Sequence, residues 1–236
     1  MLGKSSIGVF CLLVYSVAAI FPCSTAMPKS NQGPRLLRLS GKIVEGEITD
    51  DGSNNVKLAL KLRLEIKNVG SKNALILKRD PVVVAREIIA TPSDAAQGKY
   101  LYLLRTLPSI ARNAEWEELQ QRINKPTPPP DLICELAPNE TSTLEITDWF
   151  YIGKKANIDP QSKSWDVIRR ASPVSLQLTL QVWSGDIETY VDREKMSFSR
   201  KLQRRWQQVG ELQLESLTSD PIPLDFAPFP VSTTKH

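Results

Sequence analysis

The sequence predicts a mostly β protein: an antiparallel β-sandwich of about nine strands, decorated by three short amphipathic helices. Three observations predict this class. Large apolar residues alternate with charged residues over 56–67, which is the period of a strand with one buried face. The alternation returns over 141–152 and 174–183. Glycine, proline and asparagine separate the apolar runs, as expected for many short strands joined by turns.

The strand at 56–67 is the clearest element. Its inward positions are all large and apolar: Val56, Leu58, Leu60, Leu62, Leu64 and Ile66. Lysine, arginine and glutamate fill most of the other face, so we expect that face to be solvated. The turn-forming segment 68–73 then predicts a hairpin into an apolar strand at 74–78.

Two further strands place aromatic and acidic residues on defined faces. In 174–183 the alternation puts Trp183 on the polar face, and in 141–152 it does the same for Trp149 and Tyr151. Asp148 falls on an inward position, where a carboxylate needs a basic partner unless a bulge turns it away. The remaining strand candidates are 42–49, 82–90, 99–107, 211–217 and 222–226.

Two of the predicted helices follow from apolar stripes. The first, over 113–123, begins at Asn113 as N-cap and ends before a proline-rich extended segment. Its stripe consists of Trp116, Leu119 and Ile123. The second, over 162–171, is expected to bury Trp165 and Ile168.

The third helix, over 197–210, combines an apolar stripe with a dense basic face. The stripe consists of Phe198, Leu202, Trp206 and Val209. Gly210 is expected to end the helix in a left-handed conformation. Between Arg193 and Arg205 six basic residues stand against one acid. The candidate anion-binding residues are Arg200, Lys201, Arg204 and Arg205, and the alternative for them is a solvated face or internal ion pairs.

The N-terminal segment predicts export. Residues 1–26 have the order of a signal peptide: Lys4, a short apolar run, and small residues before a cut after Ala26. Retention as a membrane anchor and lipid attachment at Cys23 are the alternatives. We expect no transmembrane segment after cleavage. Residues 27–37 are predicted to be a disordered linker, 38–226 a single β-sandwich domain with helical insertions, and 227–236 a disordered tail.

The composition excludes several kinds of chemistry. His236 is the one histidine and the last residue, so histidine-based triads and zinc sites are not expected. After signal removal Cys134 is the one cysteine, which rules out an internal disulfide. We predict no catalytic, cofactor-binding or metal-binding residue and no cofactor. A glycosidase needs two carboxylates and remains an alternative, with candidates Glu145, Asp148, Asp166 and Glu188.

A resemblance to a known family supports the sandwich. A long alternating strand, an N-x-G turn and the segment "LAPNETSTLEI" together resemble bacterial-style immunoglobulin-like domains, where an L-x-P-G-E turn leads into a strand. Asn139 stands at the position of that glycine. The resemblance covers about residues 40–190 and implies an extracytoplasmic sandwich without implying any active-site residue.

Aromatic residues on solvated faces indicate binding. Trp183, Trp149 and Tyr151 are candidate sugar-stacking residues, unless helices cover them. We therefore expect an exported, noncatalytic protein that acts as a binding module or as a structural module. The alternative is a domain for carbohydrate or an anionic envelope polymer. The expected partner is a protein or glycan of the cell envelope, and nucleic acid is not expected.

Overall fold

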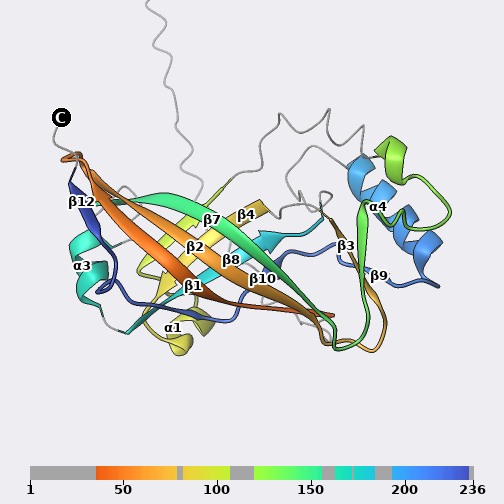
Figure 1. Ribbon diagram of the computed structural model, residues 1–236, viewed down its shortest axis with the longest axis horizontal. Helices are drawn as coiled ribbons and strands as arrows, with labels where there is room; N and C mark the ends of the chain where they lie inside the picture. Colours follow the sequence, from red (N-terminus) through yellow and green to blue (C-terminus); the bar gives the residue numbers. More distant parts are fainter. Residues whose placement is uncertain are drawn as a thin grey trace, which may run out of the picture. The chain divides into compact units, whose positions relative to one another are not determined.

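The computed structural model describes residues 36–78, 82–106, 120–155, 163–171, 173–183 and 193–233, and they form a mostly β structure (Figure 1). The strands are β1 (Leu37–Asp50), β2 (Asn55–Asn68), β3 (Ala74–Leu77), β4 (Val82–Ile89), β5 (Tyr102–Arg105), β6 (Ile133–Leu136), β7 (Thr141–Gly153), β8 (Val174–Gln181), β9 (Glu211–Leu212), β10 (Leu217–Thr218), β11 (Ile222–Leu224) and β12 (Val231–Thr233). The helices are α1 (Pro92–Ala96), α3 (Trp165–Arg170) and α4 (Arg193–Trp206), and residues 120–123 are also helical. The predicted class is confirmed, with more strands than expected; β1, β2 and β7 are longer than predicted, and several of the others are shorter.

The strands form three sheets. A four-stranded sheet has the order β12-β1-β2-β7, and a second sheet has the order β10-β8-β4-β5 with β11 also paired to β8. A third, small sheet has the order β6-β3-β9. Most pairs are antiparallel, but β12 runs parallel to β1 and β9 runs parallel to β3.

The main core contains side chains of the four-stranded sheet together with those of β4 and β8. The inward face predicted for β2 is confirmed, because its six apolar side chains from Val56 to Ile66 are at most 2% exposed. The inward residues of β8 are buried as well. Two inter-sheet contacts tie these layers together: Arg86 of β4 binds Asp148 of β7, and the Tyr102 hydroxyl donates to the Tyr151 carbonyl.

A second core lies under α4. The helix packs its apolar stripe against the small β6-β3-β9 sheet, beside which it lies in Figure 1. Gly210 follows the helix, but its φ is not positive, so the predicted left-handed cap is wrong. The glycine is needed for a different reason: a Cβ there would lie 2.7 Å from the Asn73 carbonyl oxygen.

The predicted hairpin after β2 is also wrong. The chain leaves the four-stranded sheet at Asn68, and β3 pairs with β6 and β9 instead. The buried Asn68 amide stabilises this crossing by donating to the carbonyl oxygens of Lys72 and Leu136. A polar side chain thus satisfies backbone groups where the chain changes sheets.

The turn before β7 contains a residue in the left-handed conformation. Asn139 has a φ of 68°, a left-handed conformation that glycine adopts freely and asparagine tolerates better than most residues. Asparagine can therefore hold the backbone of this turn without a glycine.

The predicted disordered tail from residue 227 is wrong for residues 227–233. β12 pairs with the end of β1, and the Ile48 amide donates to the Pro230 carbonyl oxygen. Phe229 packs over Gly46 of β1, where a Cβ would overlap its ring. The apolar side chain of Phe229 and the missing side chain of Gly46 thus anchor the segment.

The structure tests one of the two shorter predicted helices fully and the other only in part. Trp165 and Ile168 of α3 are buried as expected. In the first predicted helix Ile123 is buried, whereas Asn113, Trp116 and Leu119 lie outside the described residues. The predicted signal segment 1–26 also lies outside them.

Candidate functional site

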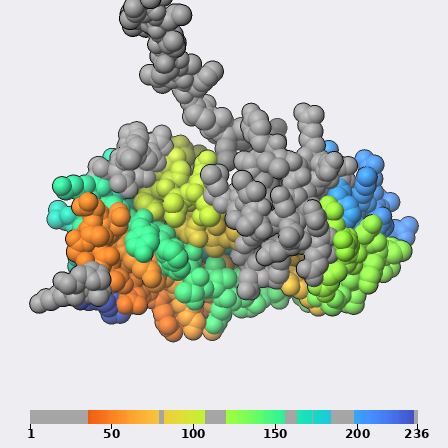
Figure 2. Space-filling view, turned by 90° about the horizontal axis from the view of Figure 1, so that it is seen from above, coloured from red at the N-terminus to blue at the C-terminus, as the bar shows by residue number. Residues whose placement is uncertain are grey.

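The candidate site is the outer face of the four-stranded sheet, meaning the side of β1, β2 and β7 that points away from the main core. Strand pairing places side chains from the three strands in rows across this face. Ala59 of β2 lies between Glu47 of β1 and Trp149 of β7, and Lys57 lies opposite Tyr151. Figure 2 shows β7 residues (green) next to those of β1 and β2 (orange) at the surface.

Two aromatic side chains dominate one end of the outer face. Trp149 is 55% exposed and Tyr151 is 50% exposed, although their neighbours Asp148 and Phe150 are buried. The two rings meet edge to face with centroids 5.7 Å apart. The Lys57 Nζ stands 5.3 Å from the centroid of the Trp149 ring, which is cation–π distance. The prediction that these two aromatics lie on the solvated face is confirmed.

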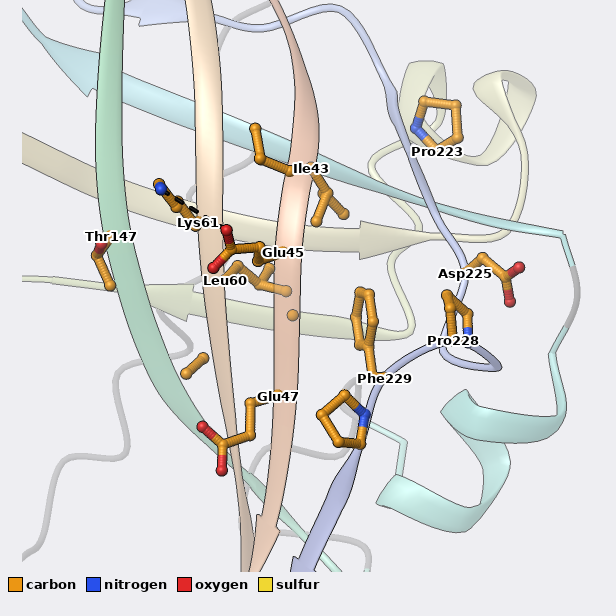
Figure 3. A pocket seen from close by; sticks show the side chains of 14 residues that line it. Ile43, Glu45, Glu47, Leu60, Lys61, Thr147, Pro223, Asp225, Pro228 and Phe229 are labelled. Carbon is orange, nitrogen blue, oxygen red and sulfur yellow. Dashed lines mark ion pairs between the residues drawn. The ribbon is translucent and has the colours of Figure 1, made fainter.

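A groove that the two aromatic side chains do not line reaches Ala59, the cross-strand partner of Trp149. It has a volume of about 720 Å³ and includes the small side chain of Ala59 in its lining. Glu45, Glu47, Lys61 and Thr147 lie on one side of β1, as Figure 3 shows. The other side is lined by prolines and by Phe229 from the C-terminal segment.

The polar side chains of the groove are partly engaged with one another. Lys61 lies 3.7 Å from Glu45 and 4.0 Å from Glu145, and Arg63 pairs with Glu145 at 2.6 Å. The hydrogen bond from Arg63 lowers the pKa of the Glu145 carboxyl. Glu47 accepts a hydrogen bond from the Ser232 hydroxyl at 2.9 Å. The face therefore offers carboxylate, ammonium and hydroxyl groups beside exposed rings.

The strand edge next to the aromatic pair is held from the opposite sheet. Burial raises the pKa of Tyr102 to about 12, so its hydroxyl keeps its proton at ordinary pH. That hydroxyl donates to the Tyr151 carbonyl oxygen at 2.7 Å. This bond fixes the β7 backbone from which the exposed rings project.

Trp183 is not part of this face, which corrects the sequence prediction. β8 ends at Gln181, so the alternation no longer sets the direction of residue 183. Trp183 is fully buried in the second core, and its indole Nε1 donates to the Ser199 hydroxyl at 2.8 Å. Its role in the structure is packing beneath α4.

The basic residues of α4 lie apart from the outer face, over the second core. Arg205 is engaged internally, because it donates to the Asn124 side chain and to the Lys125 carbonyl oxygen. Arg200, Lys201 and Arg204 are exposed. Arg205 is exposed as well, so all four basic side chains are accessible, and Arg205 differs from the others by its two hydrogen bonds.

The carboxylates considered for hydrolysis are separated. Asp148 is buried and bound to Arg86 by two hydrogen bonds of 2.6 Å, which confirms the predicted need for a basic partner. Glu145 belongs to the same strand but points to the outer face, so the two do not flank a common substrate. Asp166 lies on α3, and Glu188 lies outside the described residues.

Sequence reasoning missed Lys57, Ala59 and Glu47 as neighbours of the aromatic pair. Alternation places each of them on an outer face. Their proximity to Trp149 depends on the register between β1, β2 and β7, for which the sequence carries no signal beyond matching strand lengths.

Comparison with known proteins gives no relative: no family model, no curated protein and no solved structure matches this chain. Within the described residues, no helix combines the length and apolar character needed to cross a membrane. The fold and the face thus define a mostly β protein with an aromatic-bearing sheet surface.

Proposed function

We propose that this protein is an exported, noncatalytic β-sandwich of immunoglobulin-like type whose outer face binds carbohydrate. The observation that carries the proposal is the exposed Trp149–Tyr151 pair, next to a groove whose lining includes Ala59. Export is inferred from the signal-like order of residues 1–26.

The chemistry of the face suits a sugar polymer. Aromatic rings left half-exposed keep apolar surface in contact with water, and a ligand that covers them recovers that free energy. The C–H faces of pyranose rings are flat apolar surfaces that stack on indole and phenol rings. Glu47, Thr147 and Lys61 stand nearby with acceptors and donors for the ring hydroxyls.

The small Ala59 side chain supports this arrangement. It lies directly opposite Trp149, so the β2 residue paired with the indole is small, and the flexible Lys57 stem is the β2 side chain that stands over the ring. Glu47, Ala59 and Trp149 form one row across β1, β2 and β7. A ligand that lies across β2 at Ala59 therefore meets the indole on one side and the Glu47 carboxylate on the other.

Binding to immobilised glycans tests the proposal. The exported chain is applied to a panel of neutral and acidic polysaccharides, with Trp149→Ala and Tyr151→Ala alongside. Val167→Ala is the matched control, because Val167 is 47% exposed but lies on α3. We expect both aromatic variants to lose binding and to keep the parent melting temperature. If the parent protein binds none of the polysaccharides in the panel, the carbohydrate proposal is overturned and a protein partner for the aromatic pair is favoured.

Export has its own test. N-terminal sequencing of the protein recovered from its native host is expected to begin at Met27. A chain that begins at Met1 contradicts cleavage, and lipid on Cys23 contradicts a freely exported form.

A further inference from the structure

Lys57 is the basic side chain nearest the aromatic pair. It projects from β2 on the same side as Trp149, and its ammonium group stands over the indole ring. Among the described residues, no carboxylate lies within ion-pair distance of Lys57. Its charge is therefore balanced only by the weak attraction of the ring.

Two carboxylates of the outer face have basic partners other than Lys57. Glu145 is shared by Arg63 and Lys61, and Glu45 lies near Lys61. Glu47, across Ala59 from the indole, accepts a hydrogen bond from the Ser232 hydroxyl and keeps its negative charge, but it does not lie within ion-pair distance of Lys57. The aromatic end of the outer face thus presents to a ligand an ammonium group, that of Lys57, which has no carboxylate partner among the described residues.

We infer that the outer face selects an acidic polysaccharide, in which a uronic acid ring stacks on Trp149 and its carboxylate pairs with Lys57. This inference rests on the proposed function and names the ligand class for the same site. Charge complementarity decides the class, because a free ammonium group beside an exposed ring attracts a sugar that carries both an apolar face and a carboxylate.

The reach of Lys57 fits this role. Lys57 pairs across the strands with Tyr151, one row along β2 from the Ala59–Trp149 pair. Neighbouring strands lie about 4.8 Å apart, close to the width of one pyranose ring. The flexible lysine stem allows the ammonium to move from the ring face to its edge, where a stacked uronate presents its carboxylate. A carboxylate is a stronger partner for an ammonium group than the face of an exposed ring.

Matched ligands isolate the charge. Hexasaccharides of polygalacturonate, alginate and hyaluronate are each compared with their carboxyl-reduced forms, which keep the sugar linkage and lose the charge. Dissociation constants are measured by calorimetry with the exported chain, and dextran sulfate serves as a probe for unspecific polyanion binding.

Matched variants isolate the residue. Lys57→Gln removes the ammonium group beside the aromatic pair. Lys42→Gln removes an exposed ammonium from the same face, opposite Arg63 and about 13 Å along the sheet from the Ala59 row. We expect Lys57→Gln to weaken the acidic hexasaccharide about fivefold, which corresponds to about 1 kcal/mol for an exposed ion pair. Lys42→Gln is expected to have no effect.

The outcomes separate the two proposals. Tighter binding of an acidic form than of its reduced form, with the difference lost in Lys57→Gln alone, supports the inference. Equal binding of both forms overturns the inference and leaves the carbohydrate function standing. Absence of binding to any of these ligands and to the neutral panel overturns both. Binding of the acidic hexasaccharides that survives both Trp149→Ala and Lys57→Gln also overturns the inference, because basic residues elsewhere on the protein, such as those of α4, then account for it.

Discussion

The buried ion pair between Arg86 and Asp148 offers the sharpest test of how the two main sheets are held together. Asp148→Asn keeps the size of the side chain and removes its charge. Arg86 then loses the charge of its partner and keeps one other hydrogen bond, to the Thr106 hydroxyl at 2.7 Å. Both members of the pair are nearly out of water, with side chains 10% and 9% exposed.

The expected magnitude follows from that burial. Breaking a buried pair by removing one partner costs about 3–5 kcal/mol, because an uncompensated charge remains inside the protein. A domain of this kind has a total stability of about 5–15 kcal/mol, so Asp148→Asn removes a large share. The double variant Arg86→Leu/Asp148→Leu removes both charges. Its free energy of unfolding is expected to be at most about 1 kcal/mol lower than that of the parent, or to be higher.

Urea unfolding followed by tryptophan fluorescence measures both effects. Glu145→Gln is the control, since it breaks the Arg63 pair of the same strand, whose side chains are each 44% exposed. We expect its unfolding midpoint to stay close to that of the parent. A double variant as unstable as Asp148→Asn would refute the reasoning, because the loss of stability would then come from altered packing and not from the unpaired charge of Arg86.

Three further predictions concern stability. Trp183→Ala is expected to cost about 3–5 kcal/mol because it empties a fully buried site, whereas Trp149→Ala leaves the urea midpoint nearly unchanged; equal losses would contradict the assignment of the two faces. The pKa of Glu145 is lowered in the folded state below its ordinary value of 4.5, so its contribution is present above that pH and is lost as the pH falls through the lowered value. Arg63→Gln is expected to flatten this acid dependence in melts between pH 6 and about 3, and an unchanged profile would contradict it. Gly210→Ala is expected to destabilise the protein by about 1–3 kcal/mol, since its methyl group meets a backbone carbonyl oxygen at 2.7 Å; a melting temperature equal to the parent's would show that the chain relaxes freely there.

Several errors of the sequence reading share one cause, which is the loss of periodicity at element ends. Strand alternation predicts Trp183 on the polar face, but β8 stops at Gln181 and Trp183 packs in the second core. The segment 68–73 has turn composition, yet it carries the chain between sheets and makes no hairpin. Phe229 has no periodic neighbours, and its burial depends on the missing side chain at Gly46.

The sequence by itself determined the strand class, the buried side of β2, β7 and β8, and the outward direction of Trp149 and Tyr151. Strand alternation is a local property. Once one face of a sheet is buried, alternation fixes whether each of these side chains points to the core or to solvent. It also determined that Asp148 needs a basic partner, because a charge cannot remain alone in an apolar interior.

Only the tertiary structure decided which residues meet across strands. That Arg86 is the partner of Asp148, and that Lys57 and Ala59 flank Trp149, depends on sheet order and register. Contacts between residues distant along the chain arise from the simultaneous packing of all the sheets, and no stretch of the sequence specifies them locally.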